Sequence, residues 1–362
     1  MKVLAVCPLA SVAGGETMLL RLVPELRSRH WDVAATVPAK GELEALLRKD
    51  GVRVVRLPLG AAAGRKPVAA VAGVTRAGSV VADADVVLLN GLSTQRVLRV
   101  LRLRRRPAVL HVTNPIGADV PAWSRSWTWS VVRAVITDSE VSAKECVAAG
   151  APADLMHPLY PPAWAGVMEP RAAPVDGPGR VGFLGRIEPR KGVEDLIVAA
   201  RRFLRGRARA SVTIVGAPSE SAPPGYMASL HAAARASGVM DRISFQGWRQ
   251  DSGEALSEFD VICVPSRAEP YSTVAAEAAA RGVPVVATRL AGLCEVVVDG
   301  ETGTLVPPGN PAALAAAIAP FLDDPGLRAR VGARARERAL QRFAPGPYAD
   351  RVDAVLRAAV GS

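Results

Sequence analysis

The sequence is poor in aromatic residues and in patterned cysteines, and each shortage argues against a class of protein. Phe, Trp and Tyr make up 4% of the 362 residues, which leaves little for stacking single-stranded bases. The cysteines Cys7, Cys146, Cys263 and Cys294 lie far apart and form no CxxC or other metal-ligand spacing. Scattered thiols suit the reducing cytoplasm, where they pack as small hydrophobic side chains. We therefore expect a cytoplasmic protein without a cysteine metal site.

Long apolar runs are also missing from the sequence. No run approaches the ~20 residues needed to span a bilayer, and 49% hydrophobic with 22% charged residues is the composition of a globular protein. A chain of 362 residues is long enough for two domains with separate cores. The opening MKVLAVCPLASVAGG resembles a short signal peptide, but the same residues make a better first strand and glycine turn.

Acidic residues are fewer than basic ones, and the net charge of +11 raises the question of nucleic-acid binding. Residues 1–170 carry 21 Lys and Arg against 14 Asp and Glu, whereas residues 171–362 carry 24 against 20. No zinc-finger, RNP-type or basic-zipper pattern accompanies this diffuse excess. We therefore expect no nucleic-acid partner.

Short apolar runs alternate with helical patterns along most of the chain. The strand-like runs include KVLAVCPL, WDVAATVP, ADVVLLNG, RVGFLG and DVICVPS, and the helical ones include ETMLLRLVPELRSR and VEDLIVAARRFL. Strands separated by helices predict parallel sheets that helices cover on both faces. The alternation stops at 158–180, where Pro and Gly dominate, and then begins again.

This pattern predicts an α/β fold of two doubly wound, Rossmann-like domains that face a central cleft. We place the domains at 1–165 and 181–345, with a linker at 166–180. The remaining residues, 346–362, predict an amphipathic helix that could pack back on the N-terminal domain. Because ligands of parallel sheets bind beyond the carboxyl ends of the strands, the candidate site residues are those that follow strands.

Two cations follow the strand RVGFLG, in the loop GRIEPRKG that enters a helix. Arg186 and Lys191 suit an anion, and a diphosphate most of all, because a guanidinium bonds two oxygens while an ammonium acts as a point charge. Gly185 and Gly192 allow a close approach of the backbone. Alternatively, both cations are solvated surface charges, with Lys191 paired to Glu188 or to Glu194.

Two acids stand eight residues apart after the strand DVICVPS. Ser272 can cap a helix that begins near Thr273, and the free amides at its start favour phosphate. Glu269 lies in the loop before this helix and Glu277 about a turn inside it. Carboxylates accept paired hydrogen bonds from vicinal hydroxyls, so their natural partner is a polyol. Alternatively, Glu269 is an exposed turn residue and Glu277 an acid on the solvent side of the helix.

The segments FLGRIEPRKGVEDLI and PSRAEPYSTVAAEAAARGVPVVAT together resemble glycosyltransferase family 4, whose members are retaining enzymes of the GT-B fold. The resemblance extends through AGLCEVVVDGETGTLVPPGNPAALAAAI and back to the N-terminal GGET turn, so it covers nearly the whole chain. The E-x7-E spacing with the downstream PVVAT is its most specific part. It implies a hexosyltransferase-type enzyme that moves a sugar from a nucleotide diphosphate donor to an acceptor hydroxyl.

The resemblance also implies roles for individual residues. Arg186 and Lys191 would hold the donor diphosphate, Glu277 would bond the ribose hydroxyls, and Glu269 would orient the transferred sugar. No resident cofactor is expected. No metal is expected either, because cations and helix amides neutralise the leaving diphosphate.

The same resemblance reaches the helix start and the first glycine turn. The backbone amides of Ser272, Thr273 and Val274 would assist donor binding, and Gly14 and Gly15 would let the first loop approach donor and acceptor. The family usually has Gly where this chain has Ser272, so the side chain there could narrow the sugar pocket. The nucleobase, the sugar and the acceptor stay open.

His111, in AVLHVTNP, ends a strand of the first domain, and the resemblance places it near the acceptor and the reacting sugar, as a fourth catalytic candidate. The acceptor could be a small molecule, a glycan or a lipid-linked compound. The acceptor-side segments 60–80 and 114–126 match no pattern. The arginine run at 96–106 is either a solvated helix end or a face that rests on an anionic membrane, which would make the protein peripheral there.

Three other interpretations compete. The motif DAD at 83–85 resembles the D-x-D metal motif of other glycosyltransferases, but Asp85 merely precedes a strand, as Asp260 does. A nicotinamide dehydrogenase needs G-x-G-x-x-G, which the first turn ASVAGGETM lacks. A nucleotide-sugar epimerase of the same two-domain fold is the closer alternative, and it would act without an acceptor.

Overall fold

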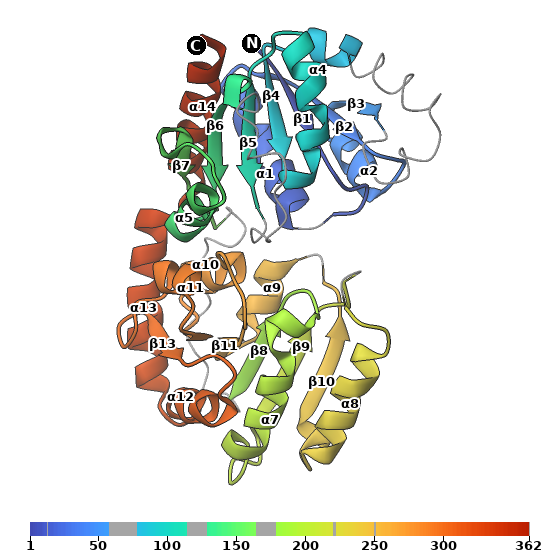
Figure 1. Cartoon of the computed structure of the whole chain (residues 1–362). Coiled ribbons are helices and arrows are strands. Elements are labelled where there is room, and N and C mark those ends of the chain that lie inside the picture. Colours follow the sequence, from blue (N-terminus) through green and yellow to red (C-terminus); the bar gives the residue numbers. More distant parts are fainter. Residues whose placement is uncertain are drawn as a thin grey trace. The chain divides into compact units, whose positions relative to one another are not determined.

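The computed structural model describes residues 1–12, 14–57, 78–113, 129–163, 179–219, 222–249 and 251–361, apart from the side chains of residues 95, 96 and 252. Most of the predicted linker at 166–180, nearly all of segment 60–80 and the whole of segment 114–126 lie outside these ranges. The chain divides into two compact units (Figure 1). Unit 1 comprises Met1–Pro161 with Gly346–Ser362, and unit 2 comprises Pro162–Pro345.

In the described part of unit 1, seven strands form a parallel sheet in the order β3-β2-β1-β4-β5-β6-β7. The strands are β1 (Lys2–Val6), β2 (Asp32–Val37), β3 (Arg53–Arg56), β4 (Val86–Asn90), β5 (Ala108–Val112), β6 (Val132–Thr137) and β7 (Met156–Pro158). The helices are α1 (Gly14–Ser28), α2 (Glu42–Lys49), η2 (Leu92–Val97), α4 (Leu98–Leu103), α5 (Glu140–Ala148), η4 (Ala153–Leu155) and α14 (Pro345–Gly361). Helices cover both faces of this sheet (Figure 1).

Unit 2 repeats the plan: its described residues form six parallel strands in the order β10-β9-β8-β11-β12-β13. The strands are β8 (Arg180–Leu184), β9 (Ser211–Val215), β10 (Ile243–Gly247), β11 (Val261–Val264), β12 (Val285–Thr288) and β13 (Gly303–Val306). The helices are η5 (Pro189–Lys191), α7 (Val193–Phe203), α8 (Tyr226–Ala236), η6 (Met240–Arg242), α9 (Ser252–Ser257), α10 (Thr273–Ala280), α11 (Ala291–Val296), α12 (Pro311–Asp323) and α13 (Pro325–Arg342). The doubly wound α/β prediction is therefore confirmed for both units.

The same hydrogen bond joins the two central strands in both sheets: an aspartate before one strand accepts it from the first backbone N–H of the other. Asp85, just before β4, accepts a hydrogen bond from the backbone N–H of Lys2 at 2.8 Å. Asp260, just before β11, accepts one from the N–H of Arg180, also at 2.8 Å. Each acid thus holds the first residue of the neighbouring strand, so the similarity of ADVVLLNG and FDVICVPS in the sequence has a structural cause. The DAD motif is part of this framework, because Asp83 pairs with Lys2 and Arg53.

Buried apolar side chains form a separate core in each unit. In unit 1 one large cluster joins Leu4, Val87 and Leu110 of the sheet to Leu98 and Leu101 of α4. In unit 2 the main cluster joins β8, β9 and β11 to helices α7, α8 and α12. The arginine run at 96–106 is helical over only part of its length, since the 3-10 helix η2 ends at Val97 and α4 ends at Leu103.

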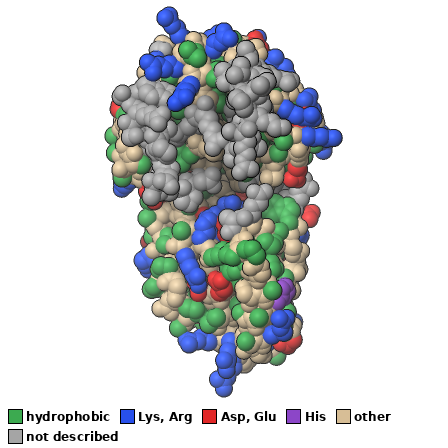
Figure 2. Space-filling view, turned by 45° about the vertical axis from the view of Figure 1, so that its right-hand side comes forward, with side chains coloured by type: hydrophobic (Ala, Val, Ile, Leu, Met, Phe, Trp, Pro, Cys, Tyr) green, Lys and Arg blue, Asp and Glu red, His purple; other side chains and the backbone are tan. Residues whose placement is uncertain are grey.

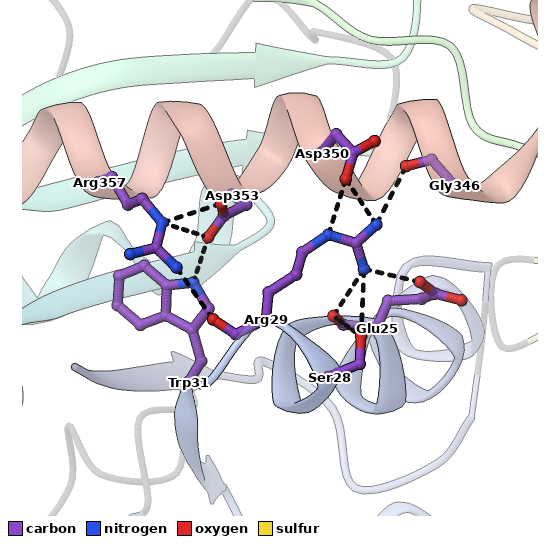
Figure 3. Close-up of polar contacts among 8 residues, drawn as sticks. All are labelled: Glu25, Ser28, Arg29, Trp31, Gly346, Asp350, Asp353 and Arg357. Carbon is purple, nitrogen blue, oxygen red and sulfur yellow. Dashed lines mark hydrogen bonds and ion pairs between the residues drawn. The ribbon is translucent and has the colours of Figure 1, made fainter.

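The C-terminal helix α14 packs in unit 1, against the end of α1 and the start of β2 (Figure 3). Arg29 donates to Asp350 through Nη2 at 2.7 Å and Nε at 2.9 Å. The indole N–H of Trp31 donates to Asp353 at 2.6 Å, and Arg357 donates to the same carboxylate at 2.8 Å. These contacts fix α14 by charge-assisted hydrogen bonds as well as by apolar packing.

The prediction that the cysteines pack as small hydrophobic side chains holds for three of the four. Cys7, Cys146 and Cys263 are buried and unpaired, while Cys294 is unpaired and exposed. Within the described ranges, no helix combines the length and apolarity needed to cross a membrane. On the face drawn in Figure 2, Lys and Arg side chains are scattered over the described surface and do not form one continuous patch.

Candidate active site

The carboxyl end of β8 leads into the loop that carries the predicted cations. The loop turns through η5 into α7, and Gly192 joins them with a φ of 67°, a conformation that favours glycine. A Cβ at Gly192 would collide with the carbonyl oxygen of Pro265, so the close approach is to the loop after β11. Residues far apart in sequence therefore share one edge of the unit 2 sheet.

Lys191 and Glu269 form a direct ion pair across these two loops. Lys191 Nζ lies 2.5 Å from Glu269 Oε2, and Ser266 Oγ donates to the same oxygen at 2.9 Å. The two side chains are 18% and 5% exposed, respectively. Burial lowers the pKa of Lys191 below its ordinary value, while the Glu269 carboxylate opposes this effect. The alternative partners Glu188 and Glu194 are wrong for Lys191, and Glu269 is not an exposed turn residue.

Arg190 and Glu188 complete the cluster, and the sequence analysis missed both as site residues. Arg190 Nη2 lies 2.6 Å from Glu188 Oε1, and its Nη1 lies 3.9 Å from Glu269 Oε1. Glu188 is buried, and its second oxygen accepts a hydrogen bond from Ser219 at 2.8 Å. Arg190 thus lies between two carboxylates. The run EPRKG could have indicated these two residues, since acidic and basic side chains close together in a loop after a strand can all reach one ligand.

Arg186 belongs to the same cluster and is its most open cation. Its Nη2 lies 3.6 Å from Glu188 Oε1, and its side chain is 40% exposed. Its positive charge also contributes to the lowered pKa of Lys191. The structure therefore brings Arg186, Lys191 and Glu269 together, as a set of cations and acids at one strand end.

Helix α10 begins where the sequence predicts. Ser272 caps it by accepting a hydrogen bond from the N–H of Ala275 at 3.3 Å. Thr273 is exposed and Val274 half-buried, so the first turn reaches the surface of the unit. Glu277 is 4% exposed, which contradicts its interpretation as an acid on the solvent side.

The remaining predicted residues belong to unit 1. Gly14 and Gly15 form the first turn of α1, and His111 lies in β5 with only 3% exposure. His111 Nε2 is 3.6 Å from Asp138 Oδ1, so a carboxylate faces the imidazole without a hydrogen bond of normal length. These residues too lie at the carboxyl edge of their sheet.

In each unit these residues lie at or next to the point where the strand order reverses, His111 being one strand away from it, on β5. In unit 1, β1 and β4 are neighbours in the order β3-β2-β1-β4, and in unit 2, β8 and β11 are neighbours in the order β10-β9-β8-β11. Crevices at such switch points are the usual ligand sites of doubly wound sheets. Among the described residues, no group of three or more His, Cys, Asp or Glu could hold a metal ion.

Two family models match the chain, one for each half. The Glycosyl transferase 4-like domain matches residues 13–162, and the Glycosyl transferases group 1 domain matches residues 169–338. Together the matched ranges include every predicted site residue.

Curated relatives match about half of the chain. Glycogen synthase of Mycobacterium tuberculosis (strain ATCC 25618 / H37Rv) is 34% identical over 170 residues, 47% of this chain and 40% of the relative. A D-inositol 3-phosphate glycosyltransferase of Kineococcus radiotolerans is 38% identical over 192 residues, 49% of this chain and 44% of the relative. The chain thus spans less than half the length of these relatives.

Solved structures match over the whole length. Anabaena Alr3699/HepE, in complex with UDP and glucose, superimposes with a TM-score of 0.85 at 23% identity and 99% coverage of both chains. Sucrose-phosphate synthase of Thermosynechococcus elongatus gives a TM-score of 0.80 at 21% identity, covering 99% of this chain and 98% of that one. With the fold shared with these GT-B proteins and family models matching both halves, the chain belongs to glycosyltransferase family 4.

Proposed function

We propose that this protein transfers a sugar from a nucleotide diphosphate donor to an acceptor hydroxyl, with retention of the anomeric configuration and without a metal ion. The observation that carries the proposal is the cluster around the Lys191–Glu269 ion pair at the switch point of unit 2. Cations that are buried beside acids suit a ligand that is anionic in one part and hydroxylated in another. A nucleotide diphosphate sugar has both parts.

In this proposal unit 2 binds the donor. Arg186 and Lys191 hold the diphosphate and stabilise the charge that develops on the leaving phosphate, which is the role of preorganised cations in such reactions. Glu269 orients the transferred sugar and Glu277 bonds the ribose hydroxyls. The amides at the start of α10 carry partial positive charge and add to the phosphate binding.

Unit 1 supplies the acceptor side in the same proposal. Gly14 and Gly15 present backbone amides of α1, and His111 lies near the acceptor and the reacting sugar. The leaving phosphate accepts the proton of the acceptor hydroxyl, while the cations keep that phosphate a good leaving group. The carbon–oxygen bond to the leaving phosphate breaks on the face where the new bond to the acceptor oxygen forms.

UDP-glucose is the first donor to test, because Alr3699/HepE has been crystallised in complexes with UDP and UDP-glucose. We propose a binding screen by isothermal titration calorimetry with UDP, GDP, ADP and TDP sugars, followed by donor hydrolysis. Saturable binding of one class that Lys191→Ala abolishes would support the proposal. A protein that binds none of these at millimolar concentration would refute it.

Three further measurements separate the finer parts of the proposal. Incubation with the donor alone tests for epimerisation, which needs no acceptor. Proton NMR of the fresh product gives its anomeric configuration. Unchanged activity after EDTA treatment supports metal independence, whereas a loss that manganese restores would contradict it.

The acceptor is proposed only as a class: a small molecule, a glycan or a lipid-linked compound. Peripheral contact with an anionic membrane is a separate proposal, based on the arginines around α4. Leu103 is 79% exposed beside Arg104 and Arg105, which are also exposed. An apolar side chain among cations suits an anionic lipid surface. If the protein does not sediment with anionic vesicles at low salt, this proposal is wrong.

A further inference from the structure

Unit 1 buries a polar group that the proposed chemistry does not use. Asn90 is the last residue of β4 and is 2% exposed. It pairs in register with His111 of the parallel strand β5, and the N–H of Gly91 donates to the His111 carbonyl at 2.8 Å. Residues paired in this way point to the same face of a sheet. The Asn90 carboxamide and the His111 imidazole are therefore neighbours at the switch point between β1 and β4.

Among the residues that the structure describes, the Asn90 side chain has no hydrogen-bond partner. Both Oδ1 and Nδ2 are buried, and neither makes a hydrogen bond to any of these residues. Leaving such a group unsatisfied costs about 1–3 kcal/mol, and most buried polar groups have a partner. The rest of β4 is Val86, Val87, Leu88 and Leu89, all buried, so a leucine at position 90 would continue the strand at no such cost.

The carboxamide faces the start of α1. A Cβ added to Gly15 would lie 3.6 Å from Asn90 Nδ2 and 2.8 Å from Thr113 Oγ1. Gly15 is in the first turn of a 15-residue helix, where backbone N–H groups have no acceptor within the helix and carry partial positive charge. An unpartnered amide, a threonine hydroxyl and free helix amides thus converge on one place.

We propose that Asn90 binds a sugar or acceptor hydroxyl of the substrate at this place, with Thr113 and the first turn of α1 beside it. A carboxamide both donates and accepts, which matches a hydroxyl group better than a phosphate, which only accepts. The proposal rests on the proposed glycosyl transfer. The hydroxyl belongs either to the transferred sugar or to the acceptor, and the two sources give different results below.

The test compares Asn90→Leu and Asn90→Ala with the wild type, using UDP and UDP-glucose, or the corresponding pair of another nucleotide that the binding screen selects. Leucine keeps the branched shape without polar atoms, and alanine covers the case in which leucine fails to fold. Thr36→Val is the matched control. Thr36 is also buried in this sheet, its hydroxyl has no hydrogen-bond partner among the described residues, and it has no proposed role.

We expect Asn90→Leu to weaken ligand binding without lowering the stability of the protein. Asn90→Leu keeps or raises the Tm, because it removes an unsatisfied polar group. If the transferred sugar is the source, the Kd of UDP-glucose rises roughly 10-fold while that of UDP changes less than about 2-fold. If the acceptor is the source, the acceptor KM rises by a similar factor. Thr36→Val changes neither Kd nor KM.

Two outcomes overturn the proposal in distinguishable ways. If the wild type binds nucleotide sugars and transfers, but both Asn90 variants match it in UDP-glucose Kd and acceptor KM, then Asn90 has no ligand role and this inference alone is wrong. If the wild type binds no nucleotide sugar, the proposed function fails, and the inference fails with it.

Discussion

Lys191 and Glu269 are 78 residues apart in the sequence, yet Lys191 Nζ donates to Glu269 Oε2 at 2.5 Å. In the proposed function the cation binds the donor diphosphate and the acid orients the sugar. In the structure, Lys191 and Glu269 instead pair with each other. Under that proposal, donor binding exchanges this internal ion pair for two contacts with one substrate.

Loss of either donor-binding cation should reduce catalysis. We expect Lys191→Ala and Arg186→Ala each to lower kcat/KM by roughly 10²-fold or more, the scale of removing one group that stabilises developing charge. Steady-state kinetics with the selected donor measure this. Arg207→Ala is the control, because Arg207 pairs with Asp323 elsewhere in unit 2. Near-normal turnover in either site variant contradicts the assigned role.

Glu269→Gln should raise the affinity for the free nucleotide but lower the turnover of the nucleotide sugar. The variant frees Lys191 from a competing carboxylate, so UDP, which has no sugar, should bind roughly 10-fold more tightly. Turnover of UDP-glucose should fall about 10²-fold, because the sugar loses its orienting group. Calorimetry gives the Kd of UDP, and kinetics give the turnover of UDP-glucose. Glu258→Gln is the control, because the Glu258 carboxylate pairs with Arg249. Equal weakening of both ligands would argue against the exchange.

The pH dependence should report the charge on Lys191. Burial lowers its pKa below the ordinary 10.5, and Glu269 partly opposes this. Deprotonation removes the cation that binds the diphosphate, so kcat/KM should fall on the alkaline side with an apparent pKa below 10.5. Glu269→Gln should move this limb to lower pH. Lys191→Arg should remove it, since a guanidinium stays charged; an unchanged limb in that variant would assign it to another group.

Arg190 should act as a positioning residue, because it connects Glu188 to Glu269. We expect Arg190→Gln to lower kcat roughly 10-fold while the Kd of UDP stays within about 2-fold. Glu188→Gln should have the same effect through loss of its pair with Arg190, and Arg190→Lys should restore part of kcat. Asp323→Asn is the matched control. A parallel loss of Tm and kcat in all variants would indicate a purely structural role.

The contact between Trp31 and Asp353 should stabilise unit 1. Asp353→Ala leaves the buried indole N–H without its partner, at a cost of about 1–3 kcal/mol, measured by urea denaturation at pH 7. Asp83→Ala removes two exposed ion pairs, with Lys2 and Arg53, and should cost less than about 1 kcal/mol. If the two variants lose the same stability, the burial argument fails.

The acid dependence of this contact follows from the pKa of Asp353. Burial alone would raise that pKa, but hydrogen bonds from Arg357 and Trp31 outweigh it and bring the pKa below 3.8. A depressed pKa in the folded state means that the stabilisation is fully present above 3.8 and is lost as the pH falls through the lower folded value. The difference between wild type and Asp353→Ala should shrink over that range.

Local patterns predicted local structure well. The strand before Arg186, the glycine at 192 and the cap at Ser272 are all encoded within a few neighbouring residues, and each occurs where the sequence indicates. The short strand β7 was missed because its residues, MHP, give no alternation and border a proline-rich stretch. The sequence pattern assigns no helix at α11, α12 or α13, although the segments that resemble glycosyltransferase family 4 cover all of α11 and the first part of α12.

Long-range partners could not be predicted in the same way. The nearest acids in sequence, Glu188 and Glu194, were natural candidates for Lys191, but they face Arg190 and Arg267 instead. Only the packing of the loop after β11 on the loop after β8 brings Glu269 to Lys191. The amphipathic pattern of α14 likewise predicts a helix but does not say which surface it covers. That choice depends on Arg29 and Trp31, more than three hundred positions earlier.

The path of α14 also bears on the order in which the chain matures during translation. Unit 2 is continuous, whereas unit 1 needs Gly346–Ser362. Those residues leave the ribosome only after the whole of unit 2 has been made. Until then α14 cannot cover the Trp31 indole and the Arg29 guanidinium of the N-terminal part of unit 1. The packing of α14 on Arg29 and Trp31 can therefore complete unit 1 only after unit 2 has been synthesised.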